Sequence, residues 1–328
     1  MTLDDRSLVF LTASRDVDSV AALPGSPWLL FACGEDLLAV DAAPVLARPA
    51  EVPPLDPEKD PRVKPVWTGF DGPAPVPTDR ELVRLRAGRV ELFAPGEPQP
   101  LRSAEISGAE GRLLPLAAGG PDRLLVLEMD LKDRELIVYR GGLIDTVGGR
   151  VTRRGLFRAP APQVTAAWSP SAGGFLVIDE VAGGLLRIAP DADKPEVALS
   201  PEPHQPRPSA LAVHPALPLV AVHLSDAMEG TSHLLTAEPE GNALRRPMRA
   251  IMPEGVIRSL AWRPDGPLLA VLRQNGRKSY LTVMDRHGAI FADARLPDGW
   301  SGTSAAWSPD GSAVLTASAN TLAVLRFG

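Results

Sequence analysis

The sequence predicts an all-β fold, a seven-bladed β-propeller built from four-stranded antiparallel blades. The stretch from Thr303 to Phe327 contains three short apolar runs separated by two turn signals, and each run is too short for a helix. Similar stretches occur at Val164–Ile188 and Arg258–Met284. A recurring meander of this length is typical of a propeller, because each blade repeats one small antiparallel sheet.

The spacing of one position predicts the number of blades. We take this position as the last residue of an inner strand, directly before its turn. It recurs about every 45 to 50 residues, near the period of a propeller blade, and therefore predicts seven units. From the N-terminus, the residues at this position are Ala22, Trp67, Ala118, Trp168, His214, Trp262 and Trp307.

Second and third strands follow in each unit. The clearest hairpin joins Leu268–Leu272 to Tyr280–Met284 across Asn275-Gly276, a dipeptide that favours tight turns. Fourth strands are less regular, and the last unit has none. The segment Ser7–Ala13 has no partner in the first unit, so we expect it to complete the last blade and close the ring.

We expect a single domain over residues 1–328, with one departure from the period at Glu51–Lys64. This segment reads E-V-P-P-L-D-P-E-K-D-P-R-V-K. Its prolines fix the backbone and remove hydrogen-bond donors, which excludes a central strand or a helix interior. The segment is therefore predicted to be a proline-rich loop between blades, either solvated or docked against a partner.

Composition narrows the class of protein. The net charge is −6, and the chain has dispersed arginines and few lysines, which argues against a general nucleic-acid binder. Cys33 is the only cysteine, so an internal disulfide and a cysteine-based metal site are excluded. A single cysteine also fits a reducing compartment.

The N-terminal sequence bears on localisation. It reads M-T-L-D-D-R-S-L-V-F-L-T-A-S, with two aspartates before a short apolar run. This start lacks the basic residues and long apolar core of a signal peptide, and the run is too short to span a membrane. We therefore expect a cytoplasmic chain without a membrane span, or a periplasmic chain if a signal peptide has been removed.

Three motifs near the C-terminus carry a family resemblance. W-S-P-D-G (307–311), W-R-P-D-G (262–266) and V-M-D-R-H-G (283–288) resemble the repeat of TolB-type, WD40-like (PD40) propellers of bacteria. The resemblance is specific over residues 255–328. It implies that the Pro-Asp-Gly segments build turns and that Trp307 packs between blades. Proteins with this repeat include periplasmic interaction proteins and propeller domains of serine peptidases, so the resemblance implies an architecture more than an activity.

Four histidines fall within one predicted blade: His204, His214, His223 and His233. A hairpin would bring His223 and His233 close across two strands, where they could hold a metal ion. We favour a structural role, because His214 takes the place of the structural tryptophan and the two strands alternate faces. No metal and no cofactor is therefore predicted.

A catalytic function is the alternative class. Metal-dependent lactonases are also propellers, with acidic and amide ligands at the channel mouth. Here such residues occupy the turns between second and third strands, at Glu35, Asp130, Glu180, Asp226 and Asn275. Acidic residues are ordinary in solvated turns, and the sequence has no nucleophile elbow, so no catalytic residue is predicted.

Aromatic and cationic residues in the blade connections are candidates for a partner-binding surface. Phe157 and Trp300 lie in connections between blades, and such side chains are enriched where proteins bind one another. Arg153, Arg154 and Arg158 form a basic group on or beside an outer strand, where a solvated face is the alternative.

The predicted function is therefore a non-catalytic platform for protein–protein interaction, a subunit of a bacterial multi-protein assembly. We expect a protein partner on the face formed by the blade connections and the turns between second and third strands. A metal-dependent hydrolase or lactonase, with carboxylates at the channel mouth, is the alternative.

Overall fold

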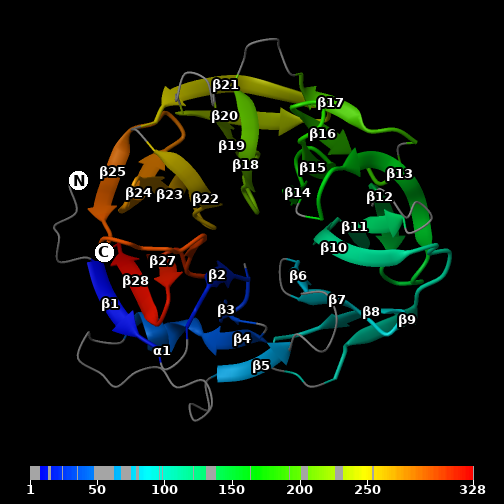
Figure 1. Ribbon diagram of the computed structural model, residues 1–328, viewed down its shortest axis with the longest axis horizontal. Helices are drawn as coiled ribbons and strands as arrows, with labels where there is room; N and C mark the ends of the chain where they lie inside the picture. The colour runs from blue at the N-terminus through cyan, green and yellow to red at the C-terminus, as the bar shows by residue number, and fades with distance from the viewer. Residues whose placement is uncertain are drawn as a thin grey trace.

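Seven four-stranded antiparallel sheets surround a central axis in the computed structural model, as Figure 1 shows. The predicted propeller is thus confirmed. The structure describes residues 8–13, 16–23, 25–34, 36–47, 63–67, 75–78, 81–95, 97, 99–120, 122–130, 138–162, 164–191, 193–200, 206–225, 232–252 and 255–327.

The first three blades are formed by consecutive strands. Blade 1 holds β2 (Ser19–Ala22), β3 (Trp28–Cys33), β4 (Asp36–Asp41) and β5 (Val63–Trp67). Blade 2 holds β6 (Val76–Pro77), β7 (Leu82–Arg86), β8 (Arg89–Phe93) and β9 (Arg102–Glu105). Blade 3 holds β10 (Arg112–Gly119), β11 (Arg123–Asp130), β12 (Val138–Asp145) and β13 (Val151–Ala159).

The next three blades follow the same order. Blade 4 holds β14 (Ala166–Ser169), β15 (Gly174–Asp179), β16 (Gly184–Ile188) and β17 (Glu196–Leu199). Blade 5 holds β18 (Arg207–Val213), β19 (Val220–Ser225), β20 (Ser232–Glu240) and β21 (Ala243–Ile251). Blade 6 holds β22 (Val256–Trp262), β23 (Leu268–Asn275), β24 (Lys278–Asp285) and β25 (Ile290–Arg295).

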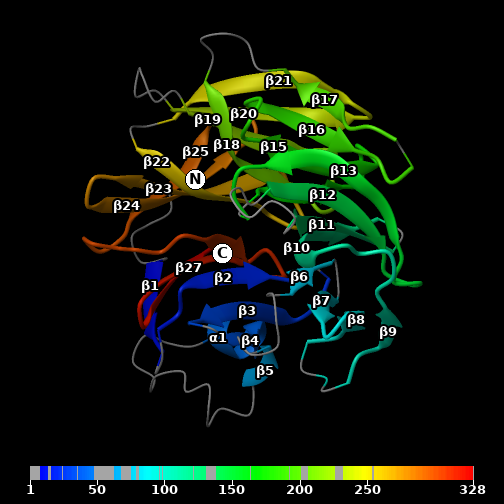
Figure 2. The ribbon, with the colours of Figure 1, turned by 45° about the vertical axis from the view of Figure 1, so that its right-hand side comes forward.

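The N-terminal strand completes blade 7 and closes the ring. This blade holds β26 (Ala305–Trp307), β27 (Ala313–Ser318), β28 (Thr321–Arg326) and, outermost, β1 (Leu8–Thr12). β1 pairs with β28 in an antiparallel register that sets Leu8 opposite Leu325. Figures 1 and 2 show the N-terminal strand beside the C-terminal ones. Because both ends of the chain share one sheet, the predicted closure is confirmed.

The core lies between the blades. Each of seven clusters of buried apolar side chains draws its members from two neighbouring blades. On β27, Val314 packs toward blade 6 and Leu315 toward blade 1. Side chains alternate along a strand, so a middle strand with both faces covered is apolar at successive positions. This arrangement explains the continuous apolar runs in the sequence.

Side chains also link the inner strands of adjacent blades. The indole nitrogen of Trp307 donates to the carbonyl of Ala261 at 3.0 Å, and that of Trp262 donates to Ala212 at 3.2 Å. The backbone N–H of Ala305 donates to the hydroxyl of Ser259 at 3.0 Å. These bonds satisfy backbone groups on the strand edges that face the channel.

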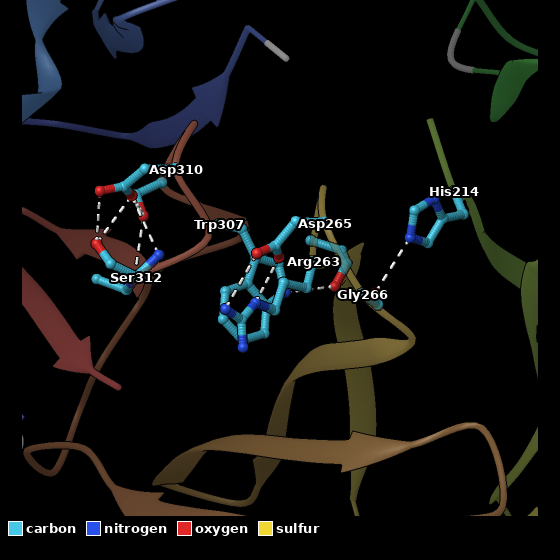
Figure 3. A network of polar contacts seen from close by, with 10 residues as sticks. His214, Arg263, Asp265, Gly266, Trp307, Asp310 and Ser312 are labelled. Carbon is cyan, nitrogen blue, oxygen red and sulfur yellow. Dashed lines mark hydrogen bonds and ion pairs between the residues drawn. The ribbon is translucent and has the colours of Figure 1, made fainter. Parts of the chain in front are cut away.

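The turns after the inner strands are held by side-chain caps, seen in Figure 3. In blade 7, the hydroxyl of Ser308 accepts from the backbone of Ala313 at 3.0 Å and donates to Asp310 at 2.6 Å. In blade 6, Arg263 pairs with Asp265 at 2.6 Å, and its guanidinium lies 5.7 Å from the centroid of the Trp307 ring. The Pro-Asp-Gly segments therefore build turns.

One predicted inner-strand position is wrong by a single residue. Val213 and Trp307 are each the last paired residue of their inner strand. His214 follows Val213 and so takes the place of Ser308, not that of a tryptophan. Both His214 and Ser308 precede a proline, and both cap the turn that follows.

A second inner-strand prediction is also wrong. Trp67 lies on the outer strand β5, opposite Leu37, and the inner strand of blade 2 is the short β6. The proline-rich segment Glu51–Lys64 therefore does not join two blades, because β4 and β5 on either side of it share one sheet. Residues 51–62 lie outside the described part of the chain, while Val63 and Lys64 begin β5.

Between β4 and β5 lies α1 (Ala42–Leu46), the one helix among the described residues. Asp41 caps its first turn by accepting a hydrogen bond from the backbone of Ala43 at 3.1 Å. Within the ranges described above, no helix has the length and apolar character that a bilayer span requires.

Candidate functional site

The central channel is lined by small and apolar side chains. It contains two adjoining hollows of about 370 Å³ and about 280 Å³, whose walls share Ala22, Val213 and Pro215. The remaining described wall residues are alanine, valine, leucine, proline, tryptophan, serine and threonine. The described walls of these hollows thus contain no ionisable side chain.

His214 joins blade 5 to blade 6. Its Nδ1 accepts hydrogen bonds from the backbone of Ala216 at 3.0 Å and of Leu217 at 2.9 Å. Two donors at Nδ1 place the ring proton on Nε2, which donates to the carbonyl of Gly266 at 3.1 Å (Figure 3). Burial lowers the pKa of His214. The neutral ring therefore has a structural role.

His223 lies between two serines inside blade 5. Its Nδ1 is 2.6 Å from the hydroxyl of Ser209, and its Nε2 is 2.8 Å from that of Ser232. Burial, reinforced by nearby His233, lowers the pKa of His223 to about 4. His233 pairs with Leu224, so it is offset by one residue from His223 and projects from the other face. The two histidines are not brought together as a metal pair.

The alternative carboxylate site is not assembled by the described residues. Glu180 and Asn275 are exposed at turns of different blades. No group of three or more histidine, cysteine or acidic residues within the described ranges is arranged to hold a metal ion. Three predicted candidates, His204, Glu35 and Asp226, lie outside these ranges, as does the side chain of Asp130.

A bulge in β13 decides which residues of the predicted basic group face solvent. Gly142 pairs with Arg154, but Arg140 pairs with Arg158, so β13 carries extra residues at this point. Gly155 has a φ of +65°, a conformation that glycine adopts readily. As a result Leu156 and Phe157 are both buried, while Arg154 and Arg158 remain exposed.

Phe157 supports this hairpin from within. Its ring packs over Gly141, where an added Cβ would lie 2.0 Å from the ring. Phe157 is only 8% exposed. The expectation that its side chain is a surface anchor is therefore not supported, because a partner would contact the outer face of the hairpin.

Trp300 is also buried, with 4% of its surface exposed. Its ring lies 6.4 Å from that of Phe10, centroid to centroid. Its indole nitrogen has no acceptor among the described residues. Trp300 therefore packs inside the junction of blades 6 and 7, and its predicted role as a surface anchor is likewise not supported.

Four arginines on β12 and β13 form what we call the arginine rim: Arg140, Arg153, Arg154 and Arg158. A guanidinium nitrogen of Arg153 lies 3.3 Å from a carboxylate oxygen of Asp193, and Arg154 lies 2.6 Å from Glu110 and 3.7 Å from the largely buried Glu128. In the pairs with Asp193 and Glu110, each side chain keeps about a third or more of its surface exposed, so solvent screens the attraction.

Arg158 differs from its neighbours in the rim. It has no ion-pair partner in the part of the chain that the structure describes. It lies directly opposite Arg140, and both side chains are exposed. Like charges opposite each other on a sheet repel. Arg140 was missed in the sequence because only the register of the hairpin sets it beside Arg158.

Comparisons with known proteins bear on the fold. Neither a protein-family model nor a curated protein matches the sequence. Among solved structures, the chain is similar to the β-propeller domain of Cps50 (Swd1) from Myceliophteria thermophila. The match has a TM-score of 0.59 and 11% identity, and it covers 96% of this chain and 97% of that one. At this identity the similarity supports the propeller fold alone.

Proposed function

We propose that this propeller is a non-catalytic platform for protein–protein interaction, and that its partner presents an acidic segment to the arginine rim. The observation that carries the proposal is the position of Arg158. It is an exposed cation on an outer strand, opposite a second arginine and without a carboxylate partner in the described part of the chain. A bound carboxylate would supply Arg158 with the counter-charge that the described residues do not provide.

Arginine suits this role because its planar guanidinium can bind a carboxylate through two parallel hydrogen bonds. Arg153 and Arg154 extend the basic surface, and their exposed ion pairs with Asp193 and Glu110 can be exchanged for a partner's carboxylates at little cost. Phe157 keeps a supporting part in the proposal, since it holds the bulge that exposes Arg154 and Arg158.

The likeness of residues 255–328 to TolB-type repeats supports a finer proposal, that the chain is a subunit of a bacterial multi-protein assembly. We also propose a cytoplasmic location, since Cys33 is the only cysteine of the chain and a single cysteine fits a reducing compartment. A platform of this kind needs a rigid scaffold and an accessible rim. The interlocked blades provide the rigid scaffold, and the outer strands provide the accessible rim.

Quantitative capture from the native host tests the proposal. We expect Arg158→Glu to weaken partner binding by about tenfold, or about 1.4 kcal/mol, because it reverses a charge at the contact. Arg245→Glu is the matched control, since Arg245 is exposed near the start of β21, on blade 5 and towards the opposite end of the outer strands. Equal binding by wild type and Arg158→Glu, at unchanged melting temperature, would contradict the proposal.

A further inference from the structure

A histidine and a methionine meet at the outer junction of blades 5 and 6. Nδ1 of His287 lies 3.0 Å from the sulfur of Met248. His287 belongs to the turn between β24 and β25, and Met248 lies on β21. The imidazole is exposed and the thioether is half-buried, so both donor atoms are close to solvent.

The turn that carries His287 is fixed by its own hydrogen bonds. One carboxylate oxygen of Asp285 accepts from the backbone of His287 at 2.8 Å and of Ala289 at 2.9 Å. Gly288 has a φ of +86°, and a Cβ added there would lie 2.8 Å from that of Ala250. The turn therefore rests directly against β21, which holds His287 beside Met248.

Two polar contacts fix the same turn to blade 5. The hydroxyl of Thr236 donates to the carbonyl of Arg286 at 2.7 Å. The guanidinium of Arg286 donates to Glu238 at 2.7 Å. Met248 pairs with Thr236 across β20 and β21. The two donor atoms are thus positioned by neighbouring backbone on both sides, as a pre-organised site requires.

We propose that His287 and Met248 form a binding site for a soft monovalent metal ion of the Cu(I) class. Thioether sulfur is a soft ligand that selects Cu(I), and imidazole is also a good ligand for copper. A monovalent ion is repelled less than a divalent one by the neighbouring Arg286, whose charge Glu238 partly offsets.

Binding requires only a local change. In the hydrogen-bonded state Nδ1 carries the proton and donates to the sulfur. On metal binding the neutral ring changes tautomer: Nδ1 gives its proton to solvent and Nε2 takes one up from solvent at this exposed residue, which frees the Nδ1 lone pair for the metal ion. For zinc, metal–nitrogen and metal–thiolate bonds are about 2.0 and 2.3 Å, and bonds of similar length here would require the two donors, now 3.0 Å apart, to separate. A side-chain rotation of the exposed His287 allows this movement.

Silver(I) is a redox-stable probe of the site. We would titrate protein labelled with ¹³C at the methionine methyl groups with silver nitrate in chloride-free buffer. The chain has six methionines, so the other methyl groups act as internal controls. The methyl signal of Met248 is expected to shift first and to saturate at one equivalent of silver.

Two variants distinguish a metal site formed by both His287 and Met248 from silver binding by a single methionine sulfur. His287→Asn and Met248→Leu should each weaken silver binding at least tenfold in calorimetry, with the melting temperature unchanged. His233→Asn and Met129→Leu are the matched controls and should bind as wild type does. The proposal is overturned if several methionines respond together, or if His287→Asn leaves the response of Met248 unchanged.

Discussion

Val20 donates its backbone N–H to the hydroxyl of Ser304 over 2.7 Å, although 284 residues separate the two. The bond joins the inner strand of blade 1 to the chain just before the inner strand of blade 7. It has a counterpart between Ala305 and Ser259, one blade earlier. The propeller ring is thus closed near its axis by the hydroxyl of Ser304 and at its outer edge by β1.

Removing either serine hydroxyl leaves a backbone N–H without its acceptor. We expect Ser304→Ala and Ser259→Ala each to lower the free energy of unfolding by about 1–2 kcal/mol, because a partly buried donor loses its partner. Ser200→Ala, at an exposed serine after β17, should have almost no effect. Urea denaturation measures all three. Equal stability of Ser304→Ala and wild type would show that water replaces the hydroxyl without cost.

The buried tryptophans provide a second test. Trp262→Phe and Trp307→Phe each remove an indole that bonds to the preceding blade, so we expect losses of about 2 kcal/mol. Trp300→Phe removes a buried N–H that has no acceptor among the described residues, so its cost should be below about 1 kcal/mol. Thermal unfolding that ranks Trp300→Phe as the most damaging change would contradict this assignment.

The stability of the protein at acid pH should depend on the protonation of His223, the buried histidine of blade 5. The pKa of His223 falls from its ordinary 6.5 to about 4 on folding, so between these values the unfolded chain binds a proton that the folded chain does not. Unfolding should therefore become easier as the pH falls from about 6.5 to about 4, by about 3 kcal/mol in total for His223.

The lowered pKa of His214 acts in the same direction. Urea denaturation at several pH values measures the slope, and His223→Gln should reduce it by about 1.4 kcal/mol per pH unit. An unchanged slope in this variant would mean that His223 binds its proton equally well in the folded and unfolded chain.

The free energy of unfolding should depend on an ion pair in blade 6, between Arg273 and Asp293. Arg273 is 5% exposed and bonds Asp293 at 2.8 Å, and Thr282 donates to the same carboxylate at 2.6 Å. Asp293→Asn removes the carboxylate that pairs with this buried guanidinium, and we expect a loss of about 2–3 kcal/mol in the free energy of unfolding. Asp298→Asn breaks an exposed pair and should leave the melting temperature unchanged. Similar effects of the two variants would contradict this account.

Much of the fold could be predicted because each blade repeats one local pattern. Apolar runs, tight turns and the unpaired N-terminal strand led to seven blades and their closure, both of which the structure confirms. His214 was misplaced because the alignment followed aromatic residues. The proline after it, Pro215, matches Pro264 and Pro309, and alignment on these prolines would have set Val213 in the tryptophan position.

The candidate site was less predictable, because it depends on irregular backbone and on contacts between distant residues. Phe157 was expected at the surface, but the bulge at Gly155 turns two successive side chains inward. Arg140 joins Arg158 only through the register of β12 with β13. His287 and Met248 lie 39 residues apart on different blades, and no sequence period links them.

Site-specific photo-crosslinking in the native host tests the interaction platform most directly. A photoreactive amino acid would replace Pro160, which is exposed two residues beyond Arg158, and, in a second version of the protein, Arg245 on blade 5. We predict a crosslink from position 160 to a protein that carries an acidic segment, its loss when Arg158→Glu is added, and none from position 245. A missing crosslink at 160, or one that persists with Arg158→Glu, would contradict the account.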